Sequence, residues 1–261
     1  MERVAFNIGP ITIYWYSICI LLGIVVALFL IFKEAKKQKI DEEFLINLAF
    51  KTIILGVIGA RLYYVIFNIP YYISNPLEII QIWNGGLAIH GGIITGLIVV
   101  YFSCKKEKIN VLKMIDIIVV GVIIAQAIGR WGNFFNQEAY GSITTLSHLK
   151  GLFLPDFIIK GMYIAGKYRQ PTFLYESILC LIGFIIMIIL RKKYKLHTGF
   201  LTGFYLLWYG CIRFLIESLR SDSLMLGPIK IAQLVSLIFI LLGAYLIRNK
   251  KKHKTRKWSY A

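Results

Sequence analysis

The chain contains seven largely apolar segments, each long enough to cross a lipid bilayer as a helix. The hydrocarbon core of a bilayer is about 30 Å thick, which takes about 20 residues of α-helix to span. None of the segments shows the alternation of apolar and polar residues that is typical of a barrel strand. We therefore predict seven transmembrane helices, over about residues 11–32, 44–67, 86–103, 112–130, 172–190, 200–218 and 229–247.

The amino-acid composition agrees with this prediction. Hydrophobic residues make up 58% of the chain and charged residues 16%, whereas soluble domains contain about 45–50% apolar and about 25% charged residues. The four cysteines lie in unrelated segments without a metal-binding or disulfide pattern. These values exclude a soluble domain, a disordered chain and a disulfide scaffold. We expect an all-α integral membrane protein in which residues 1–261 form a single transmembrane domain.

Lysine and arginine are distributed unequally between the loops, which predicts the orientation in the membrane. Nineteen of them lie in the loops 33–43, 104–113 and 191–198 and in the basic tail 248–261, and seven lie on the opposite side. Because cytoplasmic loops carry the excess of positive charge, we expect the N-terminus outside and the C-terminus in the cytoplasm. Topology and attraction to anionic lipid explain the net charge of +17, so we expect no nucleic-acid partner.

One connection is much longer than the others. Residues 131–171 separate the fourth and fifth expected helices on the outer side. Loops of this length are uncommon in a compact domain unless they have a function. We expect this segment to form a small extracytoplasmic head. The two halves of the chain show no internal repeat of the kind that many transporters have.

Polar and ionisable side chains of the expected helices gather in the outer half of the membrane. Such residues are costly in a bilayer and by default mark a functional site. In the sixth segment, Tyr209, Arg213 and Glu217 recur every four residues and therefore share one helix face. Asp116 lies toward the cytoplasmic side, and we expect it to be structural. The set in the outer half comprises Tyr14, Tyr16, Arg61, His90, Arg130, Glu176, Tyr209, Arg213, Glu217 and Arg220.

The arginines of this set indicate an anionic ligand, and we interpret them as a phospholipid head-group site. A guanidinium group stays charged and donates paired hydrogen bonds that match a phosphate group. Simpler explanations stay open: Arg213 and Glu217 as an ion pair that holds one helix, the glycines around His90 as a packing surface, and Arg220 as an interfacial residue. Cys211 has a nucleophilic thiol, but a cysteine within an apolar helix is usually a small hydrophobic residue. No metal-binding motif is present, so we expect neither a metal nor a cofactor.

Four sequence blocks resemble the bacterial prolipoprotein diacylglyceryl transferase family. The longest is GRWGNFFNQEAYG at 129–141, which matches the family pattern GRxGNFxNxExxG. The others are GGLAIHGG at 85–92, RQPT with LYE within 169–176, and YGCIR at 209–213 with Glu217 and Arg220. The blocks appear in the family order, and the resemblance extends over about residues 10–247.

The resemblance implies a seven-helix enzyme of the bacterial plasma membrane, surrounded by membrane lipids and without a cofactor. Such an enzyme transfers the diacylglyceryl group of phosphatidylglycerol to the lipobox cysteine of prolipoprotein signal peptides, which forms a thioether and releases glycerol phosphate. The catalytic residues that it implies are Arg130 and Arg213, which bind the phosphate, and His90, which either accepts the thiol proton or binds the head group. The substrate-binding residues that we expect are Tyr16, Arg61, Asn133, Asn136, Glu138, Tyr209, Glu217 and Arg220.

Two other classes of protein remain as alternatives. A transporter for an anionic lipid or solute predicts polar residues that continue to the cytoplasmic side, where Asp116 stands nearly alone. A non-catalytic membrane scaffold that binds lipoproteins leaves the many polar groups inside the expected helices unexplained.

Overall fold

The structure is a computed structural model that describes residues 2–9, 11–220, 225–227 and 229–249. Most of the expected basic tail, from residue 250 onward, lies outside the described residues. The chain divides into two units, Met1–Ile31 with Asp116–Ala261 and Phe32–Ile115. Helix α1 (Trp15–Lys37) and helix α5 (Val111–Asn136) contribute residues to both units.

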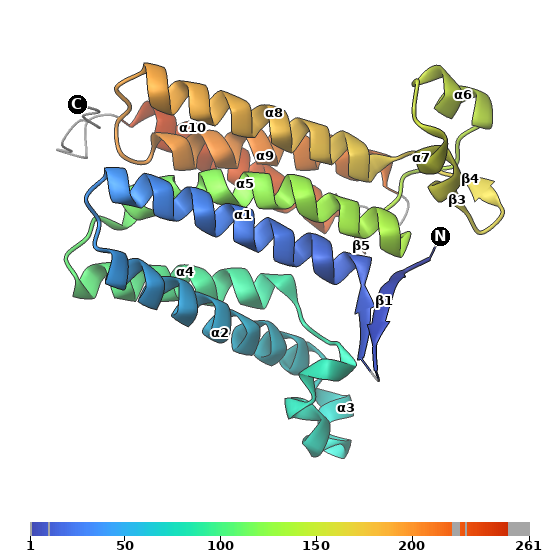
Figure 1. Cartoon of the computed structure of the whole chain (residues 1–261), viewed down its shortest axis with the longest axis horizontal. Helices are drawn as coiled ribbons and strands as arrows, with labels where there is room; N and C mark the ends of the chain where they lie inside the picture. The colour runs from blue at the N-terminus through green and yellow to red at the C-terminus, as the bar shows by residue number, and fades with distance from the viewer. Residues whose placement is uncertain (1, 10, 221–224, 228, 250–261) are drawn as a thin grey trace. The chain divides into compact units, whose positions relative to one another are not determined.

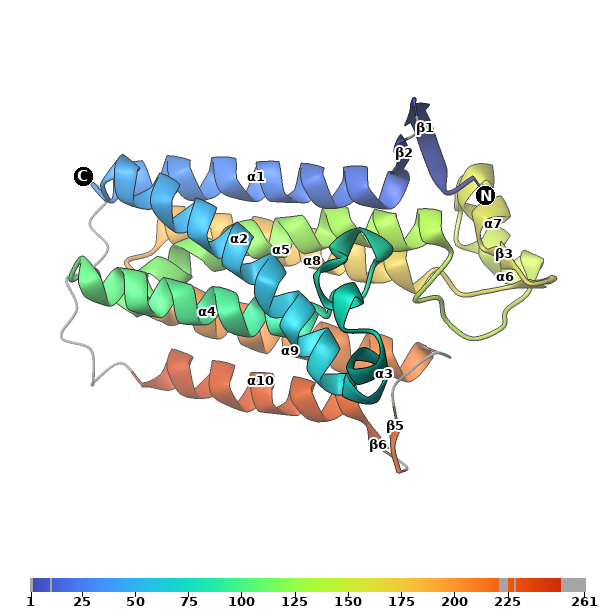
Figure 2. The same ribbon diagram turned by 90° about the horizontal axis from the view of Figure 1, so that it is seen from below.

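Apart from residues 137–171, the described part of the first unit is a bundle of long helices with two short hairpins. Helix α9 packs against both α8 and α10 (Figures 1 and 2). Hydrogen bonds from side chains connect its helices, among them Ser177 Oγ to Ala127 O, Trp208 Nε1 to Leu179 O, and Gln126 Nε2 to Tyr205 Oη. Its elements are β1 (Val4–Ile8), β2 (Ile11–Tyr14), α1 (Trp15–Lys37), α5 (Val111–Asn136), α8 (Thr172–Lys193), α9 (Phe200–Leu219), β5 (Met225–Leu226), β6 (Ile229–Lys230) and α10 (Ile231–Arg248).

Asp116 holds the start of α9. Its carboxylate is fully buried and accepts hydrogen bonds from Gly199 N at 2.6 Å, Thr202 N at 2.7 Å and Thr202 Oγ1 at 2.6 Å. The first N–H groups of a helix lack partners within the helix, and an acceptor with negative charge satisfies them well. The bond network fits the structural role predicted for this residue.

A small folded segment between α5 and α8 belongs to the same unit. It contains α6 (Leu146–Gly151), α7 (Asp156–Gly161) and a hairpin of β3 (Tyr163–Ile164) with β4 (Lys167–Tyr168). The segment has its own apolar core, which includes residues from the adjoining ends of α5 and α8. The buried side chains of this core are Phe134, Leu149, Ile158, Ile159, Met162 and Phe173.

The second unit is a helix pair with a folded connection. Helix α2 (Glu42–Phe67) packs along α4 (Ile89–Lys106). The connection contains α3 (Ile69–Ser74) and two short 3₁₀ turns, η1 (Pro76–Ile80) and η2 (Ile82–Asn84). The side chain of Asp41 caps the first turn of α2 by accepting a hydrogen bond from Phe44 N at 2.8 Å.

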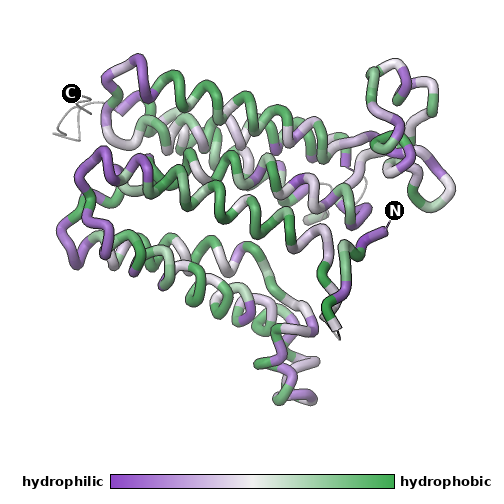
Figure 3. Tube along the Cα trace, viewed as in Figure 1, coloured by the Kyte–Doolittle hydropathy of each residue, from purple (hydrophilic) through white to green (hydrophobic). Residues whose placement is uncertain are grey.

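Six helices among the described residues are long and apolar enough to cross a membrane: α1, α2, α5, α8, α9 and α10. The remaining expected segment, 86–103, is also helical, but its helix α4 falls outside this group. It is 18 residues long and includes His90 and two terminal lysines, which lower its hydropathy. Hydrophobic residues fill the middle of the long helices and hydrophilic ones their ends (Figure 3). The prediction of an all-α integral membrane protein is therefore confirmed at the level of its helices.

Several predicted boundaries are wrong. Residues 11–14 and 229–230 are strands, and 86–88 precede α4, because apolar residues at the membrane surface also suit short hairpins and turns. Helix α5 continues to Asn136, so 131–136 belong to a helix and not to the loop predicted for 131–171. This extension places the longest sequence motif on a helix.

Candidate active site

The end of α5 positions the first group of predicted site residues. Arg130 and Asn133 are three residues apart, and Arg130 Nη1 donates a hydrogen bond to Asn133 Oδ1 at 3.2 Å. The helix ends in a left-handed residue, Gln137 with φ +52°, whose N–H bonds to Phe134 O. The next N–H, of Glu138, bonds to Asn133 O, which completes a Schellman ending. This turn brings the Glu138 carboxylate back to Asn133 Nδ2 at 2.8 Å.

Glu176 of α8 joins two arginines from two other helices. Its Oε1 lies 2.5 Å from Arg130 Nη2, and its Oε2 lies 3.4 Å from Arg213 Nη1. The Glu176 side chain is only 3% exposed. One buried carboxylate therefore sets the spacing between Arg130 of α5 and Arg213 of α9.

The polar face predicted for the sixth segment is present on α9. Arg213 Nη2 lies 2.6 Å from Glu217 Oε2, and Tyr209 Oη accepts a hydrogen bond from Arg130 Nη2 at 3.4 Å. Tyr205, one turn before Tyr209, stacks on its ring at 5.8 Å between centroids. This face thus meets the α5 and α8 groups in one network.

The two arginines of the network contact an equal number of buried carboxylates. Two arginines face two carboxylates, Glu176 and Glu217, both nearly fully buried. Burying charges in a bundle is expensive unless they are paired, and such groups in a membrane helix usually serve a function. Each guanidinium has five N–H groups, and the contacts described here leave some of them for a ligand. Chemically, the arrangement suits an anion that bridges two fixed guanidinium groups.

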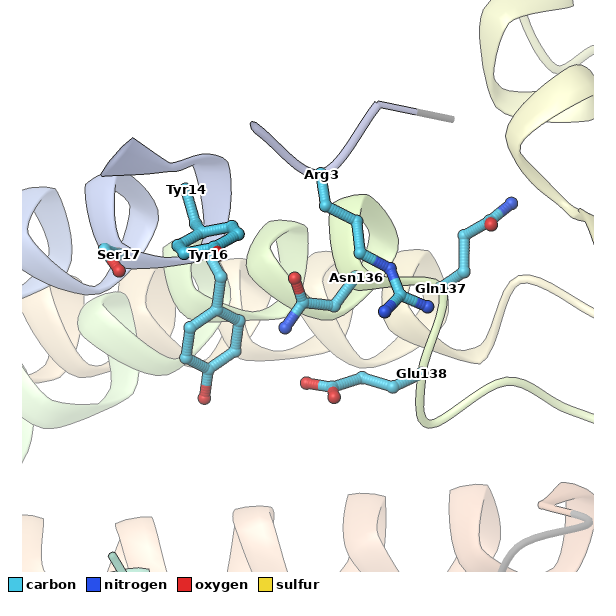
Figure 4. A pocket seen from close by; sticks show the side chains of 7 residues that line it. All are labelled: Arg3, Tyr14, Tyr16, Ser17, Asn136, Gln137 and Glu138. Carbon is cyan, nitrogen blue, oxygen red and sulfur yellow. The ribbon is translucent and has the colours of Figure 1, made fainter. Parts of the chain in front are cut away.

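A pocket of about 410 Å³ lies beside this network (Figure 4). Tyr16 of α1 and Asn136 and Glu138 of the α5 terminus face it, and Arg3 extends toward it from the N-terminal segment. The Tyr16 ring packs directly against Gly132, where any larger residue would collide with it. Ser17, Tyr14 and Gln137 complete the lining. The pocket is polar on several sides, as expected for a site that accepts a head group.

Most of the predicted site residues are therefore brought together in the first unit. Arg220 forms an isolated β-bridge with Gly141 at the end of α9. His90 and Arg61 belong to the second unit, where the exposed His90 stands in the first turn of α4, 6.1 Å from the Tyr63 ring. Arg61, which is predicted to bind substrate, donates through Nε, Nη1 and Nη2 to backbone carbonyls of its own unit.

Glu176 is the central residue that is missing from the predicted catalytic and substrate-binding residues, although it belongs to the outer-half set. The signal for it was an acidic residue in the outer half of an apolar segment, at the level of Arg130. Its role depends on which helices are neighbours, which spacing along the chain does not reveal. The described residues contain no group of three or more His, Cys, Asp and Glu side chains that would hold a metal ion.

Fold and site together define a multi-pass helical membrane protein with a largely buried network of two arginines and two carboxylates. A family model of prolipoprotein diacylglyceryl transferase matches residues 3–248. The chain belongs to this family.

Curated relatives agree with this assignment. Proteins called phosphatidylglycerol–prolipoprotein diacylglyceryl transferase from Streptococcus pneumoniae strains ATCC 700669, Taiwan19F-14 and JJA are each 47% identical to the chain. Each match covers 97% of the chain and 96% of the relative. The resemblance stated from the sequence blocks is thus confirmed.

Proposed function

We propose that this protein transfers the diacylglyceryl group of phosphatidylglycerol to the lipobox cysteine thiol of a prolipoprotein. Family membership and the names of the relatives support this reaction. The observation that carries it at the level of the site is the pair Arg130 and Arg213, held on the single carboxylate of Glu176. This arrangement fits the one charged group of phosphatidylglycerol, its phosphate diester.

The reaction exchanges one bond for another at a glyceryl carbon. The thiol loses its proton, and the thiolate sulfur attacks the carbon that carries the phosphate ester. A sulfur–carbon bond forms as the carbon–oxygen bond breaks, and the oxygen leaves with its electron pair as part of glycerol phosphate. Negative charge therefore grows on the departing phosphate in the transition state.

Arg130 and Arg213 stabilise that charge in this proposal. Fixed donors aimed at developing charge are often the largest single contribution to catalysis. Glu176 and Glu217 hold the two guanidinium planes before the substrate arrives, because each carboxylate contacts at least one of them within 3.4 Å. Asn133 and Glu138 complete the orientation of Arg130, and Tyr16 and Asn136 face the adjacent pocket, where glycerol hydroxyl groups are accommodated.

We also propose the membrane arrangement that the basic loops predict. All seven long helices cross the bacterial plasma membrane, with the N-terminus outside and the C-terminus in the cytoplasm. The segment from α6 to β4 then forms an extracytoplasmic head. The site lies in the outer half of the membrane, where both lipid head groups and secreted prolipoproteins are available.

The transporter alternative has weaker support. It requires polar groups that continue past the site toward the other end of the bundle. Asp116, the ionisable residue predicted there, already accepts three hydrogen bonds from the start of α9. Its carboxylate therefore serves as a helix cap.

His90 is our candidate for the group that accepts the thiol proton. Histidine is the side chain whose unperturbed pKa lies nearest to neutral pH, and an efficient general base contributes about a hundredfold to ten-thousandfold. We expect His90→Gln to lower turnover by at least about a hundredfold at pH 7 and to lose less activity at higher pH, where the thiol ionises by itself. Measuring transfer against pH for both proteins tests this, and a variant with most of its activity at pH 7 would exclude the base role.

Cys211 has no catalytic role in this proposal. It lies two residues from Arg213 on α9, and residues at this spacing point to different sides of a helix. Cys211 is also exposed. We expect Cys211→Ala to keep its activity within about twofold of the unmodified protein. A lipid adduct trapped on Cys211 would instead indicate a covalent intermediate and contradict direct transfer.

The proposed reaction is tested with purified protein, phosphatidylglycerol and a lipobox peptide. The control is the same peptide with serine in place of its cysteine. We expect the thioether product and glycerol phosphate with the cysteine peptide alone, as detected by mass spectrometry. Absence of product from a folded, monodisperse preparation would contradict the proposal and direct attention to lipid transport.

A further inference from the structure

Arg61 of α2 is enclosed by the connection that links α2 to α4. Its Nε donates to Ile79 O at 2.8 Å and its Nη2 to Glu78 O at 2.5 Å. Its Nη1 donates to Gly85 O at 2.8 Å and Gly86 O at 3.0 Å. Four hydrogen bonds thus join one guanidinium to two separate stretches of the connection, one at each of the short turns η1 and η2.

Aromatic rings and a glycine complete the enclosure. The guanidinium carbon of Arg61 lies 5.3 Å from the Tyr72 ring and 6.0 Å from the Tyr64 ring, and the whole residue is only 6% exposed. Gly86 has φ +72°, and a Cβ atom there would collide with Arg61 Nη1 and the Tyr64 ring. The connection therefore folds closely around the arginine, and a residue larger than glycine at position 86 would collide with it.

A hydrogen bond between two exposed side chains also stabilises the connection. Tyr71 Oη donates to Glu78 Oε2 at 2.8 Å, which raises the pKa of Tyr71 above its ordinary value because the phenol would lose this bond on ionising. Glu78 lies within the η1 turn, whose carbonyls bind Arg61, and Tyr71 lies in α3, which precedes this turn. Arg61 and Tyr71 thus hold the same turn.

The partners of Arg61 differ in kind from those of the arginines in the candidate active site. Arg130 and Arg213 face side-chain carboxylates. Arg61 faces backbone carbonyl groups, whose positions are fixed by the chain itself. A phosphate could displace them only by unfolding the connection. The four bonds therefore serve the connection and not a ligand.

The end of the connection leads directly into α4. Ala88, the residue before the helix, donates its N–H to Ala60 O at 3.0 Å, next to Arg61. His90 follows in the first turn of α4, four residues after Gly86. Anchors at residues 60 and 61 thus fix the backbone from 85 to 88, from which His90 projects.

We propose that Arg61 is a positioning residue that folds residues 76–88 around its guanidinium group and so sets the placement of His90. The effect of Arg61 on turnover rests on the proposed function. The effect of Arg61 on the fold of the connection does not depend on any activity. It assigns to Arg61 a role in the reaction without contact to phosphatidylglycerol.

The first test measures the mobility of the connection. A spin label is attached to Leu77→Cys, an exposed position of η1, in a Cys211→Ser background, since the other three cysteines are buried. We expect a restricted label with Arg61 present, a mobile label in Arg61→Ala and an intermediate one in Arg61→Lys. Lysine keeps the charge but lacks the planar fork that reaches two turns at once. An unchanged spectrum in Arg61→Ala would overturn the proposal.

The second test separates positioning from substrate binding by kinetics. We expect Arg61→Ala and Gly86→Ala to lower kcat by about a hundredfold, as misplacement of a catalytic group does, with the KM for phosphatidylglycerol within about twofold of the unmodified value. Gly166→Ala is the matched control, because Gly166 has a similar φ of +76° but open space around its Cβ position. We expect it to leave both constants unchanged.

A positioning role and a phosphate-binding role of Arg61 predict opposite kinetic effects. If Arg61 bound the phosphate, Arg61→Ala would raise KM strongly and Gly86→Ala would not, and this pattern would contradict the inference. If the unmodified protein transfers no lipid, the proposed function fails, and the spin-label spectra alone then decide whether Arg61 holds the connection.

Discussion

Replacing Arg130 or Arg213 by alanine is expected to lower transfer by about a hundredfold to a thousandfold, with the protein still folded and in the membrane. Removing one fixed donor from developing negative charge has an effect of this size in other enzymes. Glu176 contacts both arginines, and Glu217 also contacts Arg213. Because these buried carboxylates fix each guanidinium in its place, neither arginine can replace the other. Initial rates of thioether formation from phosphatidylglycerol measure the loss.

Two further variants make this prediction specific. Arg130→Lys and Arg213→Lys keep the positive charge but lose the planar fork, and we expect partial activity between that of the alanine variants and the unmodified protein. Lys160→Ala in the segment between α5 and α8 removes an exposed charge and serves as the control for net charge. Turnover at the unmodified rate in either alanine variant would show that the arginines do not stabilise the leaving phosphate.

Glu176→Gln is expected to cost about 3 kcal/mol of unfolding free energy, because it leaves two neighbouring guanidinium groups without their shared counter-charge. Breaking a buried ion pair by removing one partner has an effect of about 3–5 kcal/mol, and the Glu176 side chain is 3% exposed. An anion should bind in place of the lost carboxylate. We therefore expect glycerol phosphate to raise the midpoint of thermal unfolding more in this variant than in the unmodified protein.

Thermal unfolding in detergent, with and without glycerol phosphate, checks both parts. The matched control is Glu43→Gln, an exposed carboxylate in the first turn of α2, for which we expect a change below about 1 kcal/mol. Equal stability of Glu176→Gln and the unmodified protein would mean that Glu176 does not bridge the two arginines. Equal stabilisation of both proteins by glycerol phosphate would place the anion elsewhere.

Much of the helical architecture can be predicted from the sequence, because the length of an apolar segment is set by the bilayer. The boundaries are less predictable. Helix α5 continues through Trp131 to Asn136 since its last turns pack into the core around Phe134, which no bilayer argument anticipates. The hairpin β1–β2 replaces the first turn expected at 11–14, because its apolar residues suit a strand equally well.

The candidate site was predictable where its residues share one helix. The spacing of Tyr209, Arg213 and Glu217 places them on one face of α9, and Arg213 pairs with Glu217 as this spacing allows. The partnership of Glu176 with both arginines was not predictable, since it depends on how α5, α8 and α9 are arranged. Arg61 shows the opposite case: its charge suggests a ligand, and its partners are backbone carbonyl groups.

The fate of one oxygen atom tests the central claim most directly. Phosphatidylglycerol is prepared with ¹⁸O in the bridge between the diacylglyceryl carbon and phosphorus, and is supplied with the lipobox cysteine peptide. If the thiolate attacks carbon and the arginines stabilise a departing phosphate, all of the ¹⁸O appears in glycerol phosphate and none in the thioether product. Recovery of the ¹⁸O in diacylglycerol would mean that the phosphorus–oxygen bond breaks, and this result would contradict the account.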